Sequence, residues 1–334
     1  MSRYKSVKLR TVLCISLAVL CHTRIALGQQ QNVPMWTSHT TGYTMVGTDP
    51  SLGAAKTKVP VALIPVKIKF PADGTILNPN ATACGGTDTP LNIIINSPLF
   101  QQAYDFTADS FDLGTTQYTD AFQRANFWTT LTTVSLDYHV LLKPLTVEPV
   151  QTLRMDPPAH IFQTTPCPLG VVLKSTFDTD VQGLLQTLGI PPTTLAVFLT
   201  YDTTFSTDSG GSEGGYHGVT STNQTYVVAS FTDLNALPGN GDDVAMMSHE
   251  LAEWMDDPLA NNMVPGWMLP GGSCNSLLEV GDRQRGVTFT VPLNGFNYHL
   301  QDLAFLSWFT RESPSSAVNQ WYSFKNILQG VSSC

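Results

Sequence analysis

Alternation of apolar and polar residues is clearest over residues 59–70, which read Val-Pro-Val-Ala-Leu-Ile-Pro-Val-Lys-Ile-Lys-Phe. Toward the end of this stretch every second residue is apolar, which is typical of a β-strand with one buried face. Asp73 and Gly74 then supply a turn. Because proline cannot donate a ladder hydrogen bond, Pro60 and Pro65 place this strand at the edge of a sheet.

Helical spacing follows in the first half of the chain. Residues 98–106 and 119–131 are predicted to be helices, and the second gathers Phe122 and Phe127 on one side. Strand character returns over residues 139–153.

The second half begins with a strand, a helix and another strand. The helix is expected to end at Gly189 and to be capped by Asp178 or Asp180. The three segments are residues 171–174, 179–188 and 195–200.

A hairpin of residues 216–220 and 225–231 comes next, and a further helix follows it. That helix is expected to be capped by Asp242 or Asp243 and to be ended by Pro258. This order of elements predicts an α+β fold, with a β-rich N-terminal half and a mixed sheet beside the last helix. The apolar residues of that helix recur at helical spacing, namely Val244, Met247, Leu251 and Trp254.

The charge of the chain excludes one class of partner. Only 13% of its 334 residues are charged, against about 25% in typical soluble domains, and the net charge is −9. No cluster of Lys and Arg occurs after residue 28. Nucleic acid is therefore not an expected partner.

The first 28 residues are typical of a secretory signal. Four cations precede an apolar run over residues 12–21, and Ala26 and Gly28 are small, as a signal peptidase requires. The run is about ten residues long, whereas a membrane-spanning helix needs about 20. We therefore expect no membrane span and a secreted protein, extracellular or periplasmic, with a net charge of −14 after cleavage.

Four cysteines remain after the signal, and an exported chain is expected to join them in two disulfides. Three pairings are possible on paper. Pairing of neighbours, Cys84 with Cys167 and Cys274 with Cys334, would keep each bridge within one half of the chain.

The predicted helix near residue 250 carries the strongest chemical pattern. His249 and Glu253 are four residues apart, so both project from one helix face and can share a metal ion. Glu250 lies next to the first ligand, as in the HExxH helix of zinc peptidases, with Glu in place of the second His. The preceding hairpin and strand–helix–strand unit give the element order of the upper half of a zincin-type domain. In that chemistry Glu250 is the general base toward a peptide or protein substrate.

A third metal ligand must come from another part of the chain. Glu279 is the preferred candidate, Asp282 the second, and His217 either a ligand or a substrate-binding residue. Ligation by His249, Glu253 and Glu279 alone would cancel the charge of Zn²⁺ and weaken it as a Lewis acid. Zinc is the expected cofactor, and a second histidine or a harder cation such as Mn²⁺ or Ca²⁺ would resolve this difficulty.

The segment Ser248–Glu253, with Asp257-Pro258, Gly266-Trp267 and Glu279–Asp282, resembles the signature of secreted bacterial proteins classed as zinc peptidases. It is also distantly similar to the plant exordium, or phosphate-induced, extracellular proteins. The resemblance implies export, a zincin-like helix, His249 and Glu253 as ligands, Glu250 as base, and Glu279 or Asp282 completing the site. Trp254-Met255 and a missing cysteine before Gly215 depart from the family pattern.

Two functions are therefore open. The first is a secreted metal-dependent peptidase, and the alternative is a non-catalytic extracellular or cell-wall-associated protein with a structural metal or carboxylate site. Carbohydrate binding would need exposed aromatic platforms, for which Trp267, Trp308 and Trp321 are candidates. The expected organisation is a signal over residues 1–28, an extended lead-in over 29–57, an N-terminal α/β segment over 58–170 and a metal-binding domain over 171–334.

Overall fold

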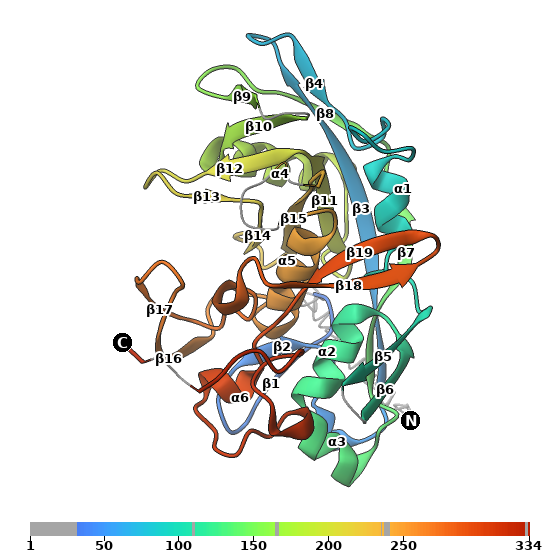
Figure 1. The fold of residues 1–334 in the computed structure, drawn as a ribbon, viewed down its shortest axis with the longest axis vertical. Helices are drawn as coiled ribbons and strands as arrows, with labels where there is room; N and C mark the ends of the chain where they lie inside the picture. Colours follow the sequence, from blue (N-terminus) through green and yellow to red (C-terminus); the bar gives the residue numbers. More distant parts are fainter. Residues whose placement is uncertain (1–31, 109–110, 164–166, 235, 237–240, 331–332) are drawn as a thin grey trace, which may run out of the picture. The chain divides into compact units, whose positions relative to one another are not determined.

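The computed structural model describes residues 32–108, 111–163, 167–234, 236, 241–330 and 333–334 (Figure 1). The predicted signal, residues 1–28, lies outside these residues. The described chain is a mixed α+β structure with several sheets, as the sequence predicts.

Seven strands form the central sheet, in which β3 (Lys56–Phe70) has partners on both sides. β11 (Leu195–Tyr201) pairs with it in parallel on one side, and β7 (His139–Val147) on the other. β15 (Thr225–Phe231) continues the sheet beyond β11, and every residue of β11 and β15 is buried. Such continuous burial is typical of parallel strands covered on both faces. The other members are β14 (Gly215–Val219), β4 (Thr75–Leu77) and β8 (Gln151–Arg154).

The prolines of β3 do not place it at a sheet edge, so that prediction is wrong. Pro60 lies at the bulge where the register with β7 shifts between Val59 and Val61. Pro65 lies between the β3 residues that pair with β7 and those that pair with β8. Both prolines occur where the ladder on the side of β7 and β8 is interrupted, which is where a strand inside a sheet tolerates them.

The predicted strand–helix–strand unit exists, but its two strands belong to different sheets. β10 (Pro168–Leu173) leads into α4 (Lys174–Leu188), which ends at Gly189 in the left-handed conformation, as predicted. α4 begins at Lys174 with Leu173 as its N-cap, so a cap by Asp178 or Asp180 is wrong.

A second sheet contains four strands, and its order is β13, β12, β10, β9. β12 follows β11 after a single residue, Asp202, whose φ is 42°. The chain passes from the central sheet to the second sheet at this residue, because β12 pairs in parallel with β10. A boundary near residue 170 therefore does not separate two sheets. The remaining bounds are β9 (His160–Gln163), β12 (Thr203–Ser206) and β13 (Ser212–Glu213).

The N-terminal region differs from its predicted elements in two places. The lead-in contains a hairpin, β1 (Met35–Thr37) and β2 (Thr44–Val46), and Met45 is fully buried. Residues 98–106 do not form a helix: the helix lies earlier, because Thr89 caps a helix that starts with proline. These elements are α1 (Pro90–Ile95), β5 (Tyr104–Ala108), β6 (Phe111–Thr116), α2 (Tyr118–Asn126) and α3 (Trp128–Val134).

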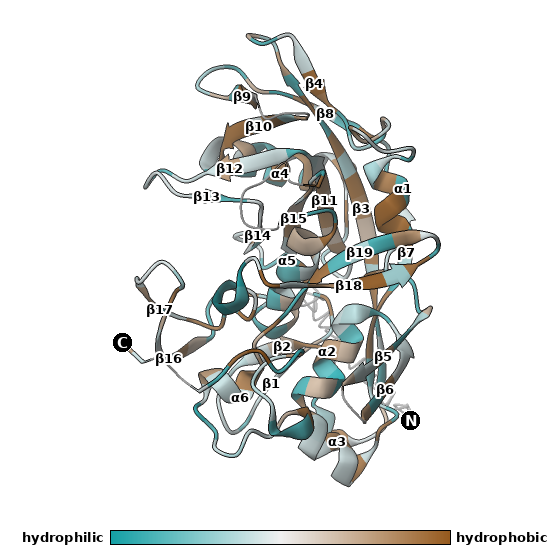
Figure 2. Ribbon diagram, viewed as in Figure 1, coloured by the Kyte–Doolittle hydropathy of each residue, from teal (hydrophilic) through white to brown (hydrophobic). Residues whose placement is uncertain are grey.

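The core lies between the central sheet and the helices. α5 (Ala245–Asp256) packs against β15, β14 and β2, and Figure 2 shows hydrophobic residues along β3 and β11. Among the described residues, no helix has the length and apolar character needed to cross a membrane. The C-terminal elements are β16 (Met263–Met268), β17 (Cys274–Leu277), β18 (Thr288–Leu293), β19 (Phe296–Gln301) and α6 (Leu306–Phe309), and the 3₁₀ turns are η1 (Pro50–Leu52), η2 (Asp282–Gln284) and η3 (Val318–Gln320).

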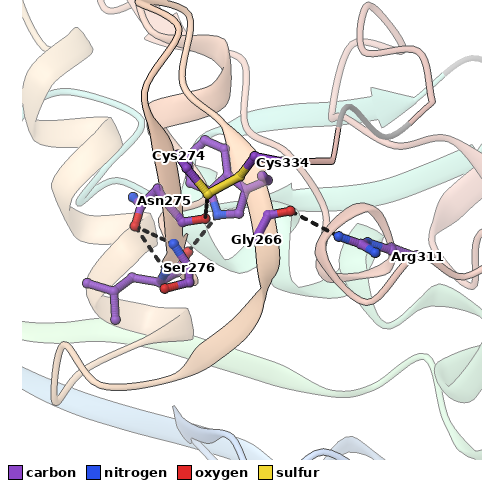
Figure 3. Close-up of a disulfide and its surroundings, with 8 residues drawn as sticks. Gly266, Cys274, Asn275, Ser276, Arg311 and Cys334 are labelled. Atoms are coloured by element: carbon purple, nitrogen blue, oxygen red, sulfur yellow. Dashed lines mark hydrogen bonds between the residues drawn. A yellow bond between two sulfur atoms is a disulfide. The ribbon is translucent and has the colours of Figure 1, made fainter.

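Two disulfides join neighbouring cysteines, which confirms the preferred pairing. Cys84 bonds Cys167 with Cα atoms 5.8 Å apart, and Cys274 bonds Cys334 with Cα atoms 6.0 Å apart. Figure 3 shows the second bridge beside Gly266, whose carbonyl oxygen accepts a hydrogen bond from Arg311 at 2.9 Å. This bridge fastens the C-terminal residue to β17, the strand immediately before Glu279.

Candidate metal centre

α5 places the predicted His-Glu pair on one face. His249 Nε2 lies 2.9 Å from Glu253 Oε1 and 3.9 Å from Glu250 Oε1, and all three side chains are at least nine-tenths buried. The four-residue spacing is sufficient to bring His249 and Glu253 together, because one helical turn separates them.

The helix begins differently from the prediction. Val244 is the N-cap of α5, and no side chain caps the helix, so a cap by Asp242 or Asp243 is wrong. Asp243 Oδ2 instead lies 2.5 Å from His299 Nδ1 on β19. His299 therefore helps to hold the start of α5 and has a carboxylate partner of its own.

His217 reaches the same cluster from the edge strand β14. Its Nδ1 lies 3.6 Å from Glu250 Oε2 and 3.7 Å from Glu253 Oε2. Each of these two glutamates thus directs one carboxylate oxygen toward His217 and the other toward His249. Gly215 allows the close approach of β14 and α5, because a Cβ there would lie 2.8 Å from Glu250 Cγ.

The loop after β17 supplies the remaining acids. The donor atoms of Glu279, His217 and Glu253 lie within 4.8 Å of one another, and those of His249, Glu250 and Glu253 form a second such group. The expected ligands His249, Glu253 and Glu279 are therefore divided between two groups that share Glu253.

Asp282 is placed at the margin of this cluster. Its Oδ1 lies 3.9 Å from His249 Nε2 and 2.5 Å from Arg285 Nη2. The guanidinium already pairs with this carboxylate, which makes Asp282 the weaker of the two acidic candidates.

A cavity of about 580 Å³ opens onto the cluster. Lys174 and Glu213 form an ion pair of 2.5 Å on its wall, and the Lys174 ammonium lies 4.5 Å from the centre of the Tyr216 ring. The cavity is thus large enough for several side chains of a peptide and offers charged, hydroxyl and aromatic groups around the acidic centre. Its lining includes His217, His249, Glu250, Glu253, Glu279, Asp282 and Arg285.

Burial and mutual charge shift the ionisation of the cluster. Burial opposes charge on His249, but Glu253 and Glu250 outweigh it and hold the pKa of His249 well above its ordinary value. Burial also opposes ionisation of Glu253, yet His249 lowers the pKa of Glu253 to about 2. Burial and the charge of Glu253 raise the pKa of Glu279 to about 11. The cluster therefore attracts positive charge, either as protons or as a cation that displaces them.

Two residues that the sequence does not single out complete the cluster. Gln301 Oε1 lies 3.1 Å from His249 Nδ1, and the Gly281 backbone N–H donates to Glu253 Oε1 at 3.0 Å. No pattern in the sequence links them to α5, since Gln301 lies 52 positions after His249 on a separate strand. Gly281 lies within the Glu279–Asp282 segment that the sequence does single out, and this position is the one feature that could have pointed to it.

Two of the three aromatic candidates for carbohydrate binding, Trp267 and Trp308, do not form a platform. Trp267 is 1% exposed and Trp308 is fully buried, and their rings pack edge to face with centroids 5.9 Å apart. The sequence-based idea of a sugar-binding surface at these two residues is therefore wrong.

Comparison of the chain with protein-family models, curated proteins and solved structures gives no match. The resemblance to zinc peptidases and exordium proteins therefore stays a prediction, and the site is interpreted from its own geometry.

The donors present fit a transition-metal ion better than an alkaline-earth ion. Two imidazoles lie among the carboxylates, whereas Ca²⁺ and Mg²⁺ prefer oxygen ligands alone. His217 Nε2 is in addition a buried nitrogen without a hydrogen-bond partner among the described residues. His217 also changes the charge argument, because two histidines and one carboxylate would leave Zn²⁺ with a net positive charge.

Proposed function

We propose that this protein is a secreted, metal-dependent peptidase with a zincin-like active-site helix and Glu250 as its general base. The single observation that carries the proposal is the convergence of His217, His249, Glu250 and Glu253 on one cavity. Disulfides and a signal-like N-terminus support export.

The metal would be held by His249 and Glu253 on α5 and by His217 on β14, which leaves a fourth position for water, and Glu279 lies beside this set. Zn²⁺ matches this mixture of nitrogen and oxygen ligands. When bound, zinc supplies a Lewis acid that polarises a carbonyl oxygen and lowers the pKa of water.

Glu250 is suited to accept a proton because both of its oxygens face the cluster. Burial raises the pKa of this carboxyl above its ordinary value, although His249 opposes the rise. A carboxylate with a raised pKa is a stronger base toward water, which is the proton donor in peptide hydrolysis. His217 lies 3.6 Å from Glu250 and limits the directions in which the carboxylate can turn.

Elemental analysis of the purified protein and hydrolysis of a broad peptide library test the proposal together. We expect about one equivalent of zinc, hydrolysis that a chelator abolishes, and restoration by added Zn²⁺. Glu250→Gln should retain zinc and lose at least about 100-fold in rate, which is the lower range for general-base catalysis. Glu312→Gln, an exposed control outside the cavity, should behave as wild type. Absence of bound metal, or full activity of Glu250→Gln, would refute the mechanism.

One observation favours the alternative of a non-catalytic extracellular or cell-wall-associated protein. His249 and Glu253 are closed into a network of hydrogen bonds with Gln301 and Gly281, as a structural site would be. Bound metal, normal folding and no hydrolysis across the library would favour this reading.

A further inference from the structure

The side chain of Gln301 lies at the end of β19 and is fully buried. Its Oε1 is 3.1 Å from His249 Nδ1, and its Nε2 donates to the Gly281 carbonyl oxygen at 2.5 Å. Its backbone N–H donates to Ser248 Oγ at 3.0 Å, which ties β19 to the residue before His249.

These contacts fix which way the amide of Gln301 points. A rotation of the amide by half a turn would bring Oε1 against the Gly281 carbonyl oxygen, and two acceptors would then face each other. The amide oxygen therefore faces His249, and His249 Nδ1 carries a proton that it donates to this oxygen. The other ring nitrogen, Nε2, is directed at Glu253.

The same peptide group of Gly281 also holds Glu253. Its N–H donates to Glu253 Oε1 at 3.0 Å, while its carbonyl accepts from Gln301. His249, Gln301, Gly281 and Glu253 thus form a closed ring of contacts. A side chain at position 281 would break the ring, because a Cβ there would lie 2.6 Å from His249 Cγ and Nδ1.

We propose that Gln301 is the positioning residue of the metal centre, setting the tautomer and ring orientation of His249 so that Nε2 is its metal-binding nitrogen. This inference rests on the proposed metal site but not on peptide hydrolysis. Partners of this kind on a ligating histidine commonly contribute 10- to 100-fold to metal affinity.

Zinc affinity of Gln301→Met, measured by competition with a chromophoric chelator, tests the inference. Methionine keeps the approximate volume of the side chain and removes both amide contacts. We expect affinity to fall about 10- to 100-fold. Gln301→Glu keeps an acceptor for His249 Nδ1 and should recover most of the loss. The control is Gln117→Met, since Gln117 is a fully buried glutamine with backbone partners away from the site, and its zinc affinity should equal that of wild type.

A second measurement needs no variant. In ¹⁵N-resolved spectra of the zinc-loaded wild-type protein, His249 should carry its proton on Nδ1. The opposite tautomer would overturn the inference, as would wild-type affinity of Gln301→Met or an equal loss in Gln117→Met. These results would leave a zinc-dependent peptidase intact, whereas a wild-type protein that binds no zinc would overturn both proposals.

Discussion

Two of the groups of buried acids among the described residues have different charge partners, and the contrast between them explains what the histidines do. In the metal centre, Glu250 and Glu253 face His217 and His249 and line a cavity. At the junction of β11 and β12, Asp202 lies beside Asp233 on the segment that follows β15.

The aspartate pair has neutral neighbours in place of histidines. Tyr201 Oη donates to Asp233 Oδ2, and the Cys84 backbone N–H donates to the same oxygen at 3.0 Å. Burial and the charge of Asp233 raise the pKa of Asp202 to about 8. Glu250 and Glu253 are therefore balanced by imidazoles that a cation can replace as charge partners, whereas Asp202, like Glu279 beside the metal centre, keeps a proton.

Glu253→Gln should have the largest effect, because Glu253 belongs to both donor groups of the metal centre. We expect loss of more than about 100-fold in zinc affinity, beyond what removal of a supporting partner causes, and loss of hydrolysis. Elemental analysis and the chelator competition measure the loss of zinc, and the peptide library measures the loss of hydrolysis.

Asp233→Asn is the matched control for this comparison. This substitution also neutralises a buried acid. Because Asp233 belongs to the aspartate pair and not to the metal centre, zinc affinity should not change. Equal zinc loss in both variants would show that buried charge in general, and not the donor set, controls metal binding.

The sequence predicts the part of the metal centre that depends on local spacing. His249 and Glu253 meet because a helix brings residues four apart together. His217, Glu279 and Gln301 arrive from a strand edge, a loop and another strand, so their convergence depends on tertiary packing. The sequence identifies His217 and Glu279 as candidates by residue type, but Gln301 is an uncharged residue without a motif.

The fold shows the same limit. β11 and β15 can be predicted because most of their residues are apolar or β-branched, and the turn between β14 and β15 is short. The position of β3 within the sheet cannot be predicted in this way, because the effect of Pro60 and Pro65 depends on a bulge and on a change of partner strand. Residues 98–106 are also misassigned as a helix, since residues 104–106 belong to β5 and pair with β6.

Removal of the Cys84–Cys167 disulfide should have the next largest effect. The bridge closes a loop of 83 residues, for which chain entropy predicts about 4 to 5 kcal/mol of stabilisation. The bridge also positions Cys84, whose backbone N–H donates to Asp233, so loss of the bridge in Cys84→Ala/Cys167→Ala should weaken this contact as well. Denaturant unfolding measures the change.

The Cys274–Cys334 bridge provides the comparison for that experiment. It closes a loop of 60 residues, and the same entropy argument gives about 4 kcal/mol. Its cysteines are exposed, so fewer native contacts are lost with it. A larger loss of stability from Cys274→Ser/Cys334→Ser would contradict a structural role for Cys84 in the aspartate pair.

The smallest predicted effect, taken over one pH unit, is the pH dependence that the aspartate pair adds to stability. The pKa of Asp202 is about 8 in the folded protein, against an ordinary value of 3.8. Between these values the folded state binds a proton that the unfolded state has released. The free energy of unfolding should therefore fall as pH rises, by at most about 1.4 kcal/mol per pH unit for this one group.

Asp202→Asn should remove this contribution and make the fall in stability between about pH 4 and pH 8 less steep. An asparagine can still accept the hydrogen bond that Asp202 Oδ1 receives from the Asp233 backbone N–H, so the fold at this junction should persist. Asp105→Asn, at an exposed position on β5, should leave the profile unchanged. Denaturant unfolding at several pH values measures the slopes. An unchanged slope in Asp202→Asn would mean that the aspartate pair is balanced by a cation, and the distinction between the two groups of acids would then fail.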